Sequence, residues 1–383
     1  MRWILPLALL ACAKQAPVTF DPTLPEQSTD VEAAPPRDVL EGAAGDLDPS
    51  LRAAALAMVL QLDWGDAWDA RALGDPSPWV QRRAVSALAA RGTPTVQAQL
   101  EAFAAQDHRA PVARAMAAIR APSSAMAATM EAAWPREPAP WNQLPLALAS
   151  LVNGDAAAQE PLARTLSTGE LPMDVELVLE VGRSGEVGLV GALQQAQARV
   201  ERELELPIAA ARWSLGDGTA EEAFRKAVSG PDVERRLEAL DILLELDRDQ
   251  ARGLIAKARN QGPELVAWYA DLALAADSGQ DPGVFERAAV HADREVRELG
   301  MRFAGQAVDG GTPHRRVVRA AEKALLQGLA DPDDTVVIAA VQAVRALRLS
   351  AAHDELAPLL ERDNARLRVE AAGTLLTLEA AGG

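Results

Sequence analysis

The chain has 383 residues, 55 of them acidic and 38 basic, so its formal net charge is −17. A surface this acidic disfavours nucleic-acid binding, because phosphates are bound mainly by Lys and Arg. Apolar residues make up 49% of the chain and aromatic residues only 4%. This balance favours many close helix contacts over one large globular core. The chain holds a single cysteine, which excludes an internal disulfide.

Residues 1–11 are predicted to be a lipoprotein signal peptide. Met1-Arg2 is a basic start, and the apolar stretch 3–10 is too short to span a bilayer. The segment Leu9-Leu10-Ala11-Cys12 resembles the lipobox of bacterial lipoproteins. That resemblance implies cleavage before Cys12, lipid attachment to Cys12, and a place in the cell envelope, with Ala13 favouring the outer membrane. The alternative is an ordinary signal peptide with an incidental cysteine.

Residues 12–40 are predicted to be a disordered tether. Prolines and acidic residues are frequent there, as in Asp21-Pro22 and Pro35-Pro36, and no hydrophobic period appears. Such a tether would let the repeats of a lipid-anchored protein extend away from the membrane.

One helical pattern recurs along residues 41–383. The fullest copies have an acid, then an apolar residue, a small residue four positions later and another apolar residue four after that, as in Asp48-Leu51-Ala55-Val59; Met116 and Leu179 replace the small residue in two weaker copies. The central residues are Ala55, Ala84, Met116, Ala149, Leu179, Ala211, Ala239, Ala270, Gly300, Ala340 and Ala371. They are 28 to 33 residues apart, with one step of 40, and such a period is typical of stacked repeats.

This pattern predicts amphipathic helices in pairs. The leading Asp suits a helix N-cap, and the apolar residues form one buried stripe. Other amphipathic segments, such as 96–103 and 220–228, lie between these helices. Because one pair cannot bury its own stripe, the pairs must stack. We therefore expect an all-α fold of about eleven stacked helix pairs, shaped as a curved rod.

The best copies resemble the HEAT-like repeat family, in the short form related to armadillo repeats and phycobilin lyases. The residues that carry the resemblance are segments 75–88, 293–300 and 363–372. It extends over roughly residues 46–381 and implies a right-handed α-α superhelix that serves as a scaffold for partners. No active-site motif of the lyases can be transferred to this chain.

Two segments that interrupt the repeat period are candidate sites for contact with a partner. Segment 133–145 contains four prolines between and around Trp134 and Trp141, which excludes a continuous helix. The two rings either form an exposed aromatic platform or pack into neighbouring helices. The second break precedes a basic cluster, Arg315, Arg316 and Arg319. The cluster either binds an acidic partner or a lipid headgroup, or is a solvated helix face paired with acids.

Five arginines on the repeat helices are further candidates. Arg82 and Arg83 are predicted to contact a partner on the concave face. For Arg52, Arg297 and Arg368, a ladder of internal bonds to the Asp caps is the stronger interpretation, as is common in this repeat family.

Motifs for catalysis are missing from the sequence. It contains neither a phosphate-binding glycine loop nor a Gly-x-Ser-x-Gly elbow. His108, His291, His314 and His353 are spread over separate repeats without metal-ligand spacing. We therefore predict no catalytic residues, no metal site and no cofactor.

The leading hypothesis is a lipid-anchored envelope scaffold that binds a protein or peptide partner on its concave face. A lyase-type or cofactor-handling protein and a structural envelope spacer are the alternatives. An open groove would favour the scaffold, and a deep pocket with perturbed ionisable groups would favour the enzyme.

Overall fold

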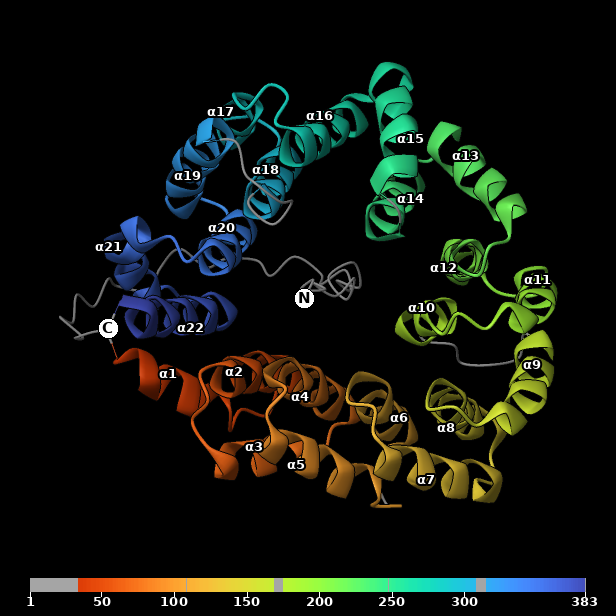
Figure 1. Ribbon diagram of the computed structural model, residues 1–383. Coiled ribbons are helices and arrows are strands. Elements are labelled where there is room, and N and C mark those ends of the chain that lie inside the picture. The colour runs from red at the N-terminus through yellow and green to blue at the C-terminus, as the bar shows by residue number, and fades with distance from the viewer. Residues whose placement is uncertain (1–33, 108, 169–174, 247, 308–314, 383) are drawn as a thin grey trace, which may run out of the picture. The chain divides into compact units, whose positions relative to one another are not determined.

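The computed structural model describes residues 34–107, 109–168, 175–246, 248–307 and 315–382. Within these ranges the chain is all-α, with 22 α-helices, six short 3₁₀ segments and no strand (Figure 1). Residues 34–383 form one compact unit. Cys12 and most of the predicted tether lie outside the described residues.

The odd-numbered helices form the outer layer in Figure 1 and the even-numbered helices the inner layer. The outer helices are α1 (Pro36–Ala43), α3 (Asp66–Leu73), α5 (Pro94–Ala104), α7 (Ser124–Ala133), α9 (Gln159–Thr168), α11 (Val190–Gln197), α13 (Glu221–Ser229), α15 (Arg248–Gln261), α17 (Val284–Ala289), α19 (Arg315–Leu329) and α21 (His353–Leu356). The inner helices are α2 (Pro49–Gln61), α4 (Pro78–Arg91), α6 (Pro111–Arg120), α8 (Pro140–Val152), α10 (Val175–Arg183), α12 (Arg202–Ser214), α14 (Val233–Leu246), α16 (Glu264–Ser278), α18 (Arg294–Gln306), α20 (Asp334–Leu347) and α22 (Ala365–Gly382). The 3₁₀ segments are η1 (Trp134–Arg136), η2 (Ala156–Ala158), η3 (Val187–Leu189), η4 (Gly218–Ala220), η5 (Ser350–Ala352) and η6 (Ala357–Glu361).

Three of the leading acids cap inner helices as predicted, whereas Ser77 and not Asp75 is the N-cap of α4. Asp48, Asp293 and Asp333 are the N-caps of α2, α18 and α20, and each side chain accepts a backbone N–H two residues on. Such a bond satisfies one of the free donors at a helix start, and the carboxylate also interacts favourably with the helix dipole.

All eleven central residues of the sequence pattern fall in the inner helices, and all are buried. Small residues on the inner helices are needed where two helices approach closely. A Cβ atom on Gly300 of α18 would lie 2.9 Å from the Cβ atom of Ala288 on α17. At Gly182 of α10, an added Cβ would lie only 2.7 Å from the Cα atom of Ala211 on α12.

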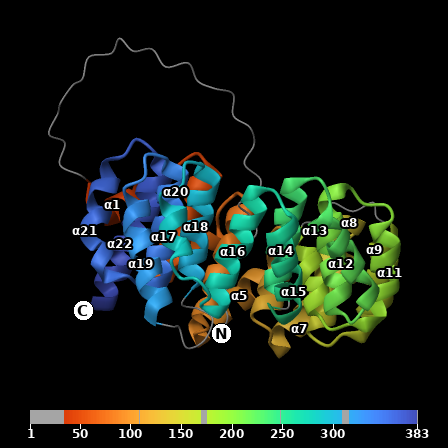
Figure 2. The same cartoon turned by 90° about the horizontal axis from the view of Figure 1, so that it is seen from above.

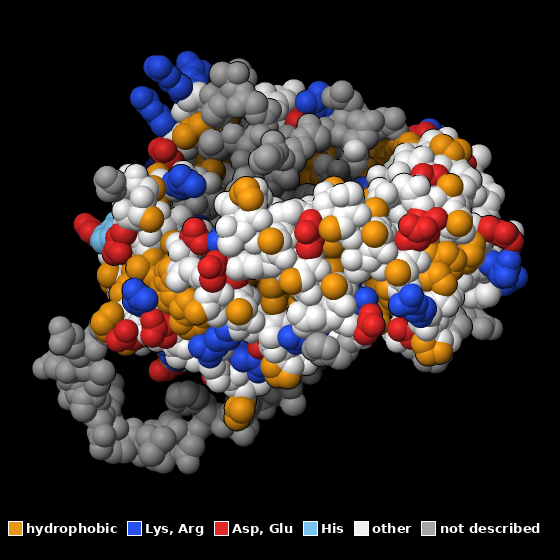
Figure 3. All heavy atoms as spheres, turned by 60° about the horizontal axis from the view of Figure 1, so that its bottom comes forward, with side chains coloured by type: hydrophobic (Ala, Val, Ile, Leu, Met, Phe, Trp, Pro, Cys, Tyr) orange, Lys and Arg blue, Asp and Glu red, His pale blue; other side chains and the backbone are white. Residues whose placement is uncertain are grey.

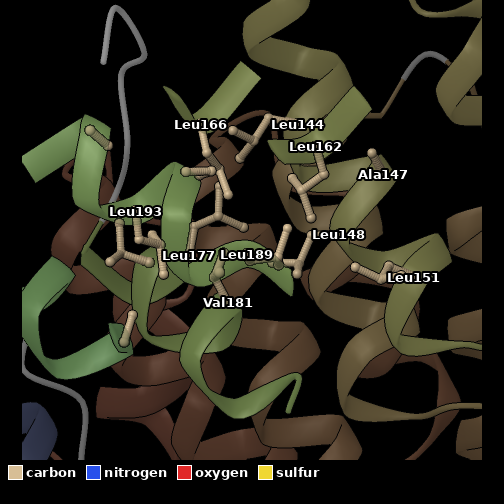
Figure 4. Close-up of a cluster of buried hydrophobic side chains, with 14 of the residues drawn as sticks. Leu144, Ala147, Leu148, Leu151, Leu162, Leu166, Leu177, Val181, Leu189 and Leu193 are labelled. Carbon is tan, nitrogen blue, oxygen red and sulfur yellow. The ribbon is translucent and has the colours of Figure 1, made fainter. Parts of the chain in front are cut away.

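Neighbouring helices share their buried faces. Each outer helix packs on an adjacent inner helix, and most successive inner helices pack on one another. In Figure 2, which views the helices from above, most of the helices stand side by side. One buried cluster joins α8, α9, α10, α11 and α12, with Leu148, Leu177 and Leu193 pointing toward a common centre (Figure 4). The core is therefore a continuous band.

The two ends of this band meet. Helix α22 packs against both α1 and α2, so the described helices form a closed ring (Figure 1). Gly373 of α22 permits this contact, because a Cβ atom there would lie 2.7 Å from Cγ of Met58 on α2. The expected curved rod is therefore a ring instead, closed by these contacts. A sequence period gives the length of a repeat but not the rotation between repeats, and that rotation decides whether the array closes.

The predicted tether also extended too far. Pro36 begins α1, and Leu40 within it is fully buried. The contact of α1 with α22 supplies the apolar surface that covers Leu40. A helix of eight residues after two prolines is too short to show a clear period, and its burial depends on the far end of the chain.

Candidate binding surface on the inner face of the ring

Three contacts between inner helices show which side chains line the inner face. Each contact skips one inner helix. Arg120 of α6 reaches Glu180 of α10 at 2.7 Å, past α8, and Arg302 of α18 reaches Asp241 of α14 at 3.4 Å, past α16. Arg345 of α20 reaches Met58 of α2, past α22. Because outer helices cover the convex side, these bonds run along the inner face (Figure 1).

The first cluster centres on Glu180, which is 4% exposed. It accepts Arg120 at 2.7 Å and Arg183 at 2.6 Å. Glu176, one turn earlier, lies 3.5 Å from Arg120. The carboxylates and guanidinium groups of this cluster are therefore matched in charge.

The second cluster centres on Glu370, which is 1% exposed. Arg345 and Arg366 both bind its carboxylate, at 2.8 and 2.5 Å, and Gln342 donates to it at 3.1 Å. Burial raises the pKa of Glu370, but the two guanidinium groups outweigh burial and hold the pKa at about 2. One carboxylate faces two arginines, so this part of the inner face is positive.

The third cluster lies on α12, α14 and α18. Asp241 accepts the Tyr269 hydroxyl at 2.6 Å in addition to Arg302. Glu205 and Glu238 share Arg235, at 2.7 and 2.8 Å. Burial raises the pKa of Glu238 even though Arg235 lowers it. Two carboxylates face one arginine here, so this part is negative.

Two inner-face charges have no ion pair among the described residues. Arg83 of α4 lies beside Trp79, with its guanidinium carbon 5.6 Å from the ring centroid. Burial lowers the pKa of Arg83, while Glu176 across the ring raises it. Burial raises the pKa of Glu298 on α18, and Arg302 lowers it. Each is a partly desolvated charge without a counter-ion, which is the state that a bound partner would relieve.

The inner face is therefore bipolar. We call Arg83, Arg345 and Arg366, with Glu370, the basic arc. We call the following set the acidic arc: Glu205, Glu238, Asp241 and Glu298, with Arg235 and Arg302. The basic arc belongs to α4, α20 and α22, and the acidic arc belongs to α12, α14 and α18. Figure 1 places α12 and α14 across the ring from α4, α20 and α22, whereas α18 packs directly against α20.

The predicted site residues do not form one site. Arg82 and Arg83 are half-buried on α4. Trp134 begins η1 and is half-buried against the α8–α12 cluster, and its Nε1 donates to Asp155 at 3.0 Å. These contacts favour the packing interpretation for Trp134. Trp141 lies in the first turn of α8, and its side chain is outside the description. Arg315, Arg316 and Arg319 lie on the outer helix α19.

The ladder predicted for the repeat arginines is confirmed at two positions. Arg52 binds Asp75 of the next repeat with two bonds of 2.9 and 3.0 Å. Arg297 binds Asp331 in the same way, at 2.6 and 3.2 Å. Arg368 differs, because its Nη1 donates to the carbonyls of Arg362 and Asp363 instead of to an Asp side chain. It lies in the last repeat, where no later Asp follows along the chain.

Other kinds of site find little support in the described part of the chain. It contains no group of three metal-ligating side chains. An open depression of about 640 Å³ lies at the N-terminal ends of α18, α20 and α22. Its charges are largely paired within the protein, Arg362 with Asp334 at 2.5 Å and Arg294 with Asp333 at 3.8 Å.

None of the helices within the described ranges has the length and apolar character needed to cross a bilayer. No protein-family model matches the chain, and no curated protein matches it.

Proposed function

We propose that this protein is a lipid-anchored scaffold of the bacterial envelope that binds a polypeptide on the inner face of its ring. In this proposal the repeats are HEAT-like, wind as a right-handed superhelix of about eleven pairs, and carry no catalytic residues. Cys12 bears the lipid, and residues 13–33 link it to the ring.

One observation carries the binding proposal: Arg83 and Glu298 are half-buried on the inner face, and neither makes an ion pair with a described residue. An unpaired charge that has lost part of its hydration is destabilising, and a partner with the opposite charge would offset that cost. The two charges have opposite sign and lie on different arcs. A polypeptide can present both an acidic and a basic side chain along its length, whereas a small ligand would have to reach both arcs at once.

Ring closure limits how such a partner enters. It either passes a free end through the ring or waits until the contact between α22 and α2 opens. A flexible chain end or an exposed loop fits the first route. This differs from an open repeat array, whose concave face accepts a partner from the side.

Chemical cross-linking in intact envelopes followed by affinity capture tests the proposal. The exported protein is compared with Arg83→Glu, Glu298→Arg and an outer-face control, Arg225→Glu, whose wild-type arginine pairs with Glu221. We expect one polypeptide to be captured by the wild type and the control, and capture to fall at least tenfold in either inner-face variant. The Cys12→Ser variant separates anchoring from binding. Equal capture by all variants, or co-purification of a small molecule alone, would refute the proposal.

A further inference from the structure

Three arginines form an exposed basic patch on the outer layer of the ring. Arg315, Arg316 and Arg319 lie in the first five residues of α19, and all three are exposed. Arg315 and Arg319 are one helical turn apart, and Arg316 lies three residues before Arg319. On the opposite face of α19, Val317, Ala320, Ala321, Ala324 and Leu325 are buried. We call the three arginines the α19 patch.

The patch has no counter-ions within the described residues. None of its arginines makes an ion pair or a hydrogen bond with a described residue. The next cation on the same helix, Lys323, pairs with Glu286 of α17. Figure 3 shows that red and blue side chains are interspersed on the face it displays. A group of three arginines without an ion pair to any described residue is unusual on a chain with 55 acidic residues.

Stability of the fold does not account for the patch. Cations in the first turn of a helix oppose the helix dipole. Like charges spaced three or four residues apart repel each other. Uncharged polar side chains at these positions would make α19 more stable, so the patch indicates an anionic partner.

We propose that the α19 patch docks the ring on an anionic lipid bilayer by binding phosphate headgroups. Arg is suited to phosphate, because its guanidinium can donate two parallel hydrogen bonds. The patch lies on a convex helix face, and neither of the two main depressions of the described chain includes its residues. A bilayer offers many phosphates and needs no complementary groove, whereas a protein partner needs a shaped interface of considerable area.

The net charge of −17 makes this contact directional. Most of the surface is repelled by an anionic bilayer, and the α19 patch is attracted. The patch would thus select which side of the ring faces the lipid. This inference does not depend on what binds the inner face.

Vesicle co-sedimentation of the unacylated protein tests the proposal. The protein is the chain from residue 12 onward carrying Cys12→Ser, so that no acyl chain contributes. It is mixed with phosphatidylcholine vesicles, with or without phosphatidylglycerol, at low and high salt. The test variant is Arg315→Gln/Arg316→Gln/Arg319→Gln. The charge-matched control is Arg164→Gln/Arg225→Gln/Lys226→Gln, which removes three exposed cations from α9 and α13.

We expect binding only to vesicles that contain phosphatidylglycerol, and weaker binding at high salt. The test variant should partition about 100-fold less, since each of the three basic residues contributes about fivefold. The control should partition like the parent. Equal partitioning of the test variant and the parent would overturn the proposal. So would binding to a glutamate-rich peptide without binding to the vesicles, because the patch would then be a protein-docking surface.

Discussion

Arg345 and Met58 are 287 positions apart in the sequence, yet Nη1 of Arg345 lies 3.0 Å from the sulfur of Met58. The same Nη1 lies 2.8 Å from Glu370. Arg366, the other arginine bound to Glu370, points Nη1 at the carbonyl of Ser50 on α2, at 3.5 Å. Both arginines held by Glu370 therefore reach across the junction between the last helix and the first repeat. Closure of the ring rests on this buried polar cluster as well as on apolar packing.

Glu370→Gln should weaken the closed ring in a pH-dependent way. The pKa of Glu370 is lowered from 4.5 to about 2 in the folded protein. Its charge therefore stabilises the fold above pH 4.5, and this stabilisation, about 3 kcal/mol, is lost as the pH falls to about 2. Urea unfolding should show the variant less stable by about 3 kcal/mol at neutral pH, with a smaller gap in acid. Glu160→Gln, at an exposed pair, is the control. If the difference in unfolding free energy between the wild type and Glu370→Gln does not change with pH, the lowered pKa of Glu370 is not the cause.

Gly373→Val should loosen the junction between α22 and α2. The new side chain has no room beside Met58, and overpacking of this kind costs about 1–3 kcal/mol. Hydrogen exchange should accelerate in α1, α2 and α22 before it does in α10 and α12. Gly191→Val is the matched control, because that helical glycine has no atom within 4 Å of an added Cβ. Uniform acceleration around the ring would argue against a distinct junction.

Arg297→Met should destabilise the protein strongly. It leaves Asp331, whose side chain is 5% exposed, without its counter-ion. Breaking one side of such a buried pair costs about 3–5 kcal/mol. Arg225→Met breaks an exposed pair and should change the unfolding free energy by less than about 1 kcal/mol. Adding Asp331→Leu to Arg297→Met should restore part of the loss. If it does not, the ladder is not the source of the effect.

Trp134→Phe separates the two interpretations of this residue. It keeps an aromatic ring against the cluster but removes the 3.0 Å bond to Asp155. We expect a loss of about 1–2 kcal/mol in thermal or urea unfolding, with capture of the envelope partner unchanged. Wild-type stability combined with reduced capture would instead make Trp134 a contact residue.

The sequence was sufficient to predict the parts of the fold that repeat locally. Asp48 and Ala55 belong to a pattern within one helix, so the cap and the close packing follow from spacing. The bond from Arg52 to Asp75 joins adjacent repeats and recurs, so it could be predicted as well. Segment 133–145 is not one continuous helix, as predicted, but Pro145 lies inside α8.

Longer-range features could not be predicted in this way. Glu370 and Arg366 form an i, i+4 pair that is visible in the sequence, but nothing in that spacing shows that it is buried or that it borders α2. The sequence allowed Arg83 to be proposed as a partner contact, because it is a charged residue on a repeat helix. Glu298 was missed, because its lack of an ion pair among the described residues depends on how far the neighbouring helices lie from α18. Features of this kind depend on the sum of small rotations between repeats.

Closure also bears on how this protein can vary. In an open array a repeat can be duplicated or lost, because only neighbours touch. Here a change in circumference would separate α22 from α2, so insertion or deletion of a whole repeat should not be tolerated. New chain ends, by contrast, could be placed between other repeats, because the present first and last helices already lie in contact.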